Sequence, residues 1–237
     1  MRVWLQEITG NETGWNAWCL DLLGLAAWSE TEAGALDRLQ TKLPAHLAWL
    51  ARHGLACPDP GTELHIIERM TGNEILFTPD RQPCDPEEVE LTIRQLAATR
   101  QDLLHTLEGL PKAAFDWDPP YRAFAEWATW RSVRAILAHI ANCETHYYLR
   151  AIGHRPRLAP APPSGDWRRF LAEHREVTLG FLGEMKSSAD LSRISFENGE
   201  AWSARKVLRR LVWHELLHTC SIRRIAKEYD GDVRTRR

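Results

Sequence analysis

Two histidines, His214 and His218, stand four residues apart in a stretch that reads as one continuous helix from Trp202 to Tyr229. Residues at this spacing lie about 40° apart around a helix and about 6 Å apart along it, so both imidazole rings can reach one cation. Apolar residues continue the same stripe at steps of three and four: Val207, Leu211, Ile222 and Ile225. The pair is therefore predicted to face a core and to bind a metal ion.

The stretch His214-Glu215-Leu216-Leu217-His218 also matches the pattern of zinc peptidases, in which the glutamate is the general base. Those enzymes take a third ligand from a histidine six residues further on or from an acid on a later helix. Arg224 occupies the first of these positions, and Glu228 lies too close on the same helix to bend back. A third ligand is therefore expected upstream, and a zinc hydrolase or peptidase is only the third hypothesis for function.

His139 is the upstream histidine best placed to join the pair. It lies in a helix predicted from about Trp130 to Ile152, with Thr129 as its cap, beside an apolar stripe of Ile136, Ile140 and Tyr147. His139 can therefore face the core of a helical bundle.

Four long helices joined by long connections predict that bundle. Their periodicity places them over Glu87 to Leu107, Trp130 to Ile152, Asp166 to Met185 and the histidine helix. We therefore expect an up-down four-helix bundle over residues 84 to 230.

The first eighty residues predict a separate small domain with the order β-β-α-β-β. The expected strands are Val3 to Ile8, Trp15 to Leu20, Leu64 to Met70 and Glu74 to Thr78. Ser29 and Glu32 are expected to form a capping box at the start of the helix. Together with the bundle this gives an α+β protein with a boundary near the three prolines between Thr78 and Pro86.

Composition excludes several classes of function. Thirty basic side chains nearly balance 32 acidic ones, which gives no reason to expect a nucleic-acid or membrane-surface partner. No apolar run approaches membrane-spanning length and no signal peptide opens the chain, so a cytoplasmic location is expected. Five cysteines without a C-x-x-C pair indicate reduced thiols and not a disulfide framework.

Three stretches resemble the DinB family, four-helix bundles that include thiol-dependent S-transferases and mycothiol-dependent maleylpyruvate isomerase-like proteins. They are Trp130 to His139, Gly199 to Ser203 and His214 to His218. The resemblance implies that His139, His214 and His218 ligate one divalent metal ion, such as zinc, nickel or iron. It also implies a small-molecule substrate, a low-molecular-weight thiol as one candidate cosubstrate, a homodimer, and no automatic catalytic role for Glu215.

Residues 1 to 55 are similar to the HicB-like antitoxin domain, chiefly in topology and in the run Trp18-Cys-Leu-Asp-Leu-Leu-Gly24. This resemblance suggests no particular task for the N-terminal unit.

Three neutral imidazoles leave a coordination position open to a ligand. A thiol bound there would give a transferase or isomerase, and water would give a hydrolase. The main alternative is a non-enzymatic binding or regulatory protein whose metal only joins two helices. Cys143, one turn from His139, is open to three interpretations: a fourth ligand, a reactive thiol or a small buried apolar residue. Glu144 and Glu215 either orient ligand rings or serve as solvated or salt-bridging groups.

Overall fold

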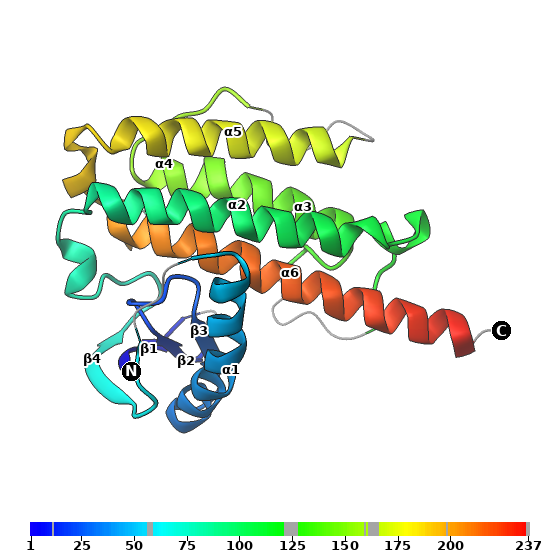
Figure 1. Cartoon of the computed structure of the whole chain (residues 1–237), viewed down its shortest axis with the longest axis horizontal. Coiled ribbons are helices and arrows are strands. Elements are labelled where there is room, and N and C mark those ends of the chain that lie inside the picture. Colours follow the sequence, from blue (N-terminus) through cyan, green and yellow to red (C-terminus); the bar gives the residue numbers. More distant parts are fainter. Residues whose placement is uncertain are drawn as a thin grey trace.

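The computed structural model describes residues 1–10, 12–55, 59–120, 128–158, 160, 166–197 and 199–235. A small sheet with one covering helix lies against one side of a long helical bundle (Figure 1). Within the described part of the chain, no helix has both the length and the apolar composition needed to cross a membrane.

The N-terminal unit is a mixed sheet of four strands in the order β3-β2-β1-β4. Strand β2 pairs antiparallel with both β1 and β3, whereas β4, which follows helix α1, pairs parallel with β1. The bounds are β1 Arg2–Ile8, β2 Gly14–Trp18, β3 Ala26–Ser29, α1 Glu32–Arg52 and β4 His65–Thr71.

The two faces of this sheet are covered by different partners, because successive side chains of a strand point to opposite faces. Val3 and Leu5 belong to the core beneath α1. Trp4 and Trp18 belong to a second apolar cluster that includes Trp213, a residue of the histidine helix. The second face of the sheet therefore contacts the helix that carries two of the predicted ligands, and the core beneath α1 also includes Ala98 and Leu216 of the bundle.

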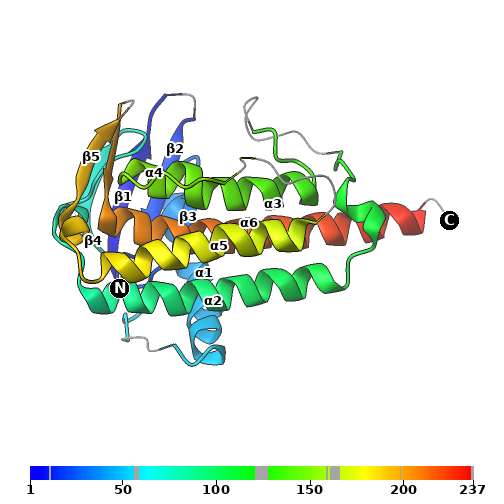
Figure 2. The ribbon, with the colours of Figure 1, turned by 90° about the horizontal axis from the view of Figure 1, so that it is seen from above.

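The bundle consists of four rods whose axes run side by side in both views (Figures 1 and 2). One rod is interrupted by a π-helical segment, η3. The bounds are α2 Pro86–Glu108, α3 Val133–Asn142, η3 Cys143–Tyr148, α4 Leu149–Ala151, α5 Trp167–Met185 and α6 Ala204–Thr235. A hairpin of β5 (Ile194–Glu197) and β6 (Glu200–Ser203) precedes α6, and short 3-10 turns lie at Pro79–Arg81, Lys112–Phe115 and Ala189–Ser192.

Local signals explain where these helices begin. Asp85 and Glu88 form a reciprocal capping box at the start of α2, with Pro86 in the first turn. At the start of α6, the hydroxyl of Ser203 accepts a hydrogen bond from the backbone N–H of Lys206.

The α+β class is confirmed, but the strand order is β-β-β-α-β and not the predicted β-β-α-β-β. Ala26–Ser29 forms a short strand because it pairs with β2, while residues 74 to 78 form no strand. The helix that follows is capped by Thr31, and the predicted Ser29–Glu32 box does not form.

The helix directions also differ from a simple up-down bundle. Apolar contacts join the start of α3 to the start of α5 and to the ends of α2 and α6. Helices α2 and α6 therefore run in one direction, and α3 and α5 run in the opposite direction. The long connection after α4 returns the chain to the end of the bundle where α3 began. The histidine helix starts at Ala204, since Trp202 belongs to β6, and α3 is capped by Ser132 in place of Thr129.

Candidate metal centre

The three predicted ligands, His139, His214 and His218, come together inside the bundle. The Nε2 atoms of His139 and His214 are 3.0 Å apart, and those of His214 and His218 are 3.1 Å apart. The ring of His139 lies 4.9 Å from that of His214 and 4.8 Å from that of His218, centre to centre. Helices α3 and α6 thus direct three imidazoles into one small volume.

This spacing fits a shared cation. Two nitrogens bound to one tetrahedral metal ion at about 2.0–2.1 Å stand about 3.3 Å apart. A neutral imidazole carries a single N–H, so the Nε2 of His214 can donate to only one of the two nitrogens beside it. A cation held by these nitrogens would need no such N–H, because each neutral ring can present Nε2 as a lone-pair donor. An imidazole donor set suits zinc, nickel and iron alike.

Burial keeps these imidazoles neutral, as ligation requires. It lowers the pKa of His139 to about 4. Burial and the neighbouring His139 together lower the pKa of His218 to about 3. The pKa of His214 lies well below its usual value, first because of burial and then because His218 and His139 repel its charged form. At neutral pH the three nitrogens are therefore free to bind a metal ion without releasing a proton.

Aromatic rings hold two of these imidazoles in place. Trp130 stacks on His139 with ring centres 3.7 Å apart and planes 13° apart. Tyr148, the last residue of η3, meets His214 edge to face at 5.4 Å. Both contacts limit rotation of the His139 and His214 rings, whose Nε2 atoms are 3.0 Å apart.

Cys143 is close to the same site. Donor atoms of His139, Cys143 and His214 lie within 4.8 Å of one another, a cluster that could bind a metal ion. However, the sulfur is 3.6 Å from Nδ1 and 3.7 Å from Nε2 of His139. Such equal distances place it over or beside the ring and not ahead of either nitrogen. A metal ion bound to Nε2 would then stand roughly 4 Å from the sulfur, well beyond the Zn–S bond of about 2.3 Å.

Glu215 faces away from the histidines and into the bundle interior. Its carboxylate accepts a hydrogen bond from Nε of Arg100 at 2.6 Å and further ones from Thr99 and Arg175. Burial disfavours the charged carboxylate, but the two arginines outweigh burial and lower its pKa to about 2. Glu215 is therefore held in ion pairs with Arg100 and Arg175 and does not point at the histidines, as the general base of a peptidase would have to.

Glu144 has the same environment, since it pairs with Arg100 and Arg175 and is only 2% exposed. The expectation of a salt-bridging role is confirmed for both glutamates, and a solvated role is wrong. Cys220 is exposed, and Cys57 falls outside the described residues.

In a comparison with protein families, the model of the DinB superfamily matches residues 95–222. This match covers more than half of the chain and includes all three histidines. The chain therefore belongs to the DinB superfamily. No curated protein and no solved structure matches it.

Proposed function

We propose that this protein is a divalent-metal-binding DinB protein in which His139, His214 and His218 hold the ion for chemistry on a small molecule. The two close Nε2 pairs that share His214, 3.0 Å to His139 and 3.1 Å to His218, carry the proposal. A divalent cation bound there would act as a Lewis acid on a ligand in the remaining coordination position. The position of the Cys143 sulfur beside the His139 ring supports an open fourth position.

Metal content of the purified protein, measured by mass spectrometry, tests this proposal. One equivalent of a transition metal is expected for the wild type, with loss of most of it in His139→Ala and His214→Ala. His105→Ala is the control, because this histidine is exposed and lies outside the cluster. Unchanged metal content in both ligand variants would end the proposal.

For the reaction, we propose that the bound ligand is a low-molecular-weight thiol, so that the protein is a transferase or isomerase. The family includes thiol-dependent enzymes, and the aromatic walls at Trp130 and Tyr148 would shield such a ligand from water. A panel of thiols, tested for metal-dependent binding to the zinc-loaded protein and then for conjugation, examines this. Binding that persists unchanged after chelation would contradict it.

A structural metal in a non-enzymatic protein is the second candidate, and it is favoured by one observation, the proximity of Cys143. A rotation of this side chain would bring a fourth protein ligand to the ion and close the site.

We further propose a homodimer, as the resemblance to the DinB family implies. Trp4, Trp18, Trp49 and Trp202 are buried within the subunit and do not supply its contact surface. The molar mass from light scattering tests this. For residues 1 to 55 the HicB-like resemblance stays a proposal without a supporting comparison.

A further inference from the structure

Two arginines and two glutamates form a closed group at the centre of the bundle, here called the ion quartet: Arg100, Glu144, Arg175 and Glu215. Arg100 bridges the carboxylates, with Nε 2.6 Å from Glu215 and Nη2 3.0 Å from Glu144. Arg175 bridges them a second time from the opposite helix. The four side chains are between 1% and 11% exposed.

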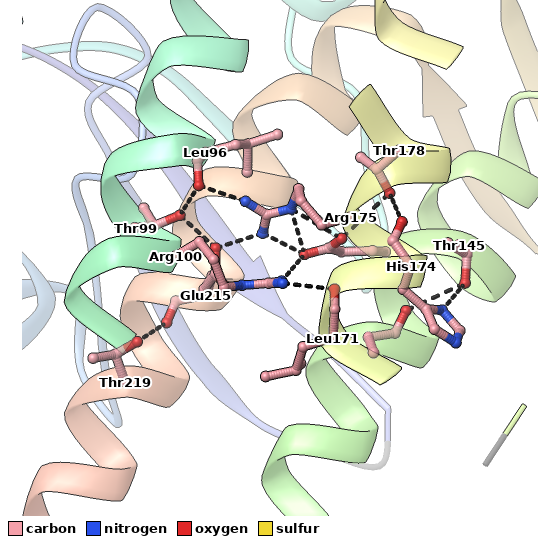
Figure 3. A network of polar contacts seen from close by, with 12 residues as sticks. Leu96, Thr99, Arg100, Thr145, Leu171, His174, Arg175, Thr178, Glu215 and Thr219 are labelled. Carbon is pink, nitrogen blue, oxygen red and sulfur yellow. Dashed lines mark hydrogen bonds and ion pairs between the residues drawn. The ribbon is translucent and has the colours of Figure 1, made fainter. Parts of the chain in front are cut away.

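The quartet is bonded to every rod of the bundle. Arg100 also donates to the backbone carbonyl of Leu171 on α5 at 2.7 Å, and Arg175 donates to that of Leu96 on α2. Thr99 donates to Glu215 and Thr178 to Glu144. Figure 3 shows Arg100 and Arg175 converging on Glu215 from two helices. Any rotation or slide of one rod would therefore break bonds to two others.

Each of the two glutamates directly follows, in the sequence, a residue at or beside the proposed metal centre. Glu215 follows His214 on α6, and Glu144 follows Cys143 one turn after His139. Adjacent residues point about 100° apart around a helix. Fixing Glu215 on the bundle axis therefore fixes the angle at which His214 and His218 face α3.

A gain in stability is a weak reason for such a group, because well-packed apolar residues often replace buried ion pairs without loss. What a charged group adds is a single allowed arrangement of its partners. From this, and resting on the proposed metal centre, we infer that the ion quartet is a positioning device that sets the rotation of α6 and η3 so that three Nε2 atoms meet at one metal position.

The alternative is a purely structural role, and the chain offers a matched pair to distinguish it. Arg209 and Asp80 form a two-bond ion pair, with side chains 6% and 1% exposed, and Arg209 lies on α6 like Glu215. This pair joins α6 to the turn at Pro79–Arg81, and among the described residues it has no hydrogen bond or ion pair with α3 or η3. Asp80→Asn and Glu215→Gln each remove one charge from a buried pair at nearly constant volume.

The test compares the affinity for Co²⁺, from competition with a chromophoric chelator, and the visible spectrum of the bound ion. Glu215→Gln and Glu144→Gln are expected to weaken binding by about tenfold or more and to change the spectrum. Asp80→Asn is expected to bind within twofold of the wild type with an unchanged spectrum, although it unfolds at lower denaturant. Thr178→Val removes a hydroxyl that lies 3.3 Å from Glu144 and 3.0 Å from the His174 carbonyl, without changing the charge of the quartet. It serves if the charge variants do not fold, and it is expected to weaken binding severalfold.

Wild-type affinity and spectrum in folded Glu215→Gln, Glu144→Gln and Thr178→Val would overturn the inference and leave the metal centre intact. So would an equal loss of affinity in Asp80→Asn, since it would trace the effect to stability. A wild type that binds no Co²⁺ would instead remove the metal centre itself and the positioning role with it.

Discussion

At the scale of single residues, the fourth donor decides between an open and a closed metal site. The sulfur of Cys143 lies beside the His139 ring and is thus misplaced for ligation. Burial also raises the pKa of this thiol to about 12, so it is protonated in the metal-free protein. We expect the Co²⁺-loaded wild type to lack a sulfur charge-transfer band and Cys143→Ser to keep its metal affinity. A near-ultraviolet band that Cys143→Ser abolishes and Cys220→Ser retains would favour the structural metal.

The buried imidazoles should also make the metal-free protein sensitive to mild acid. His139 and His218 have pKa values of about 4 and about 3 when folded, so between pH 6.5 and 4 only the unfolded chain takes up their protons. Stability is then complete above about pH 6.5 and falls as the pH drops, by about 1.4 kcal/mol per histidine at pH 5.5. Urea unfolding at pH 7.5 and 5.5 in a chelator measures this loss. His139→Asn should reduce it and His105→Asn should not; equal losses in all three proteins would contradict the explanation.

At the scale of elements, the loop before β3 is packed tightly against the histidine helix. Gly24 has a φ of +88°, and a Cβ there would lie 2.7 Å from Leu216 and 3.0 Å from Val212, both on α6. Gly24→Ala is expected to destabilise the protein by about 1–3 kcal/mol in denaturant unfolding, from backbone strain and overpacking. Gly10→Ala is the control, since Gly10 also has a positive φ, +119°, but nothing within 4 Å. Equal effects of the two substitutions would show that the close approach to α6 has no energetic consequence.

At the scale of the whole molecule, two further contacts join the N-terminal unit to the bundle. Asp102 on α2 accepts hydrogen bonds from Trp49, Arg52 and His53 at the end of α1. Trp18 packs on Trp213 with ring centres 5.2 Å apart. Because each part covers apolar surface of the other, we expect one calorimetric unfolding transition whose van't Hoff enthalpy equals the calorimetric one. Two resolved transitions would show that the parts unfold separately.

The sequence by itself determined the helices, the inward stripe on α6 and the three histidines. Those features follow from spacing along one chain segment, and the period of a helix converts spacing into direction. The N-terminal strand order was not readable in this way, because the short strand Ala26–Ser29 is defined by its pairing with β2.

Only the tertiary structure decided what surrounds the histidines. In the sequence, Glu215 matches the general base of a zinc peptidase. In the structure, Arg100 of α2 and Arg175 of α5 form ion pairs with its carboxylate. An arginine within the apolar stripe of a helix is the only sequence feature that could have indicated these buried ion pairs. The same pattern also occurs where the arginine faces solvent. The pairing of each arginine with a glutamate depends on how the four rods of the bundle pack. That packing is determined by contacts between distant segments, and residue spacing within a single helix does not reveal it.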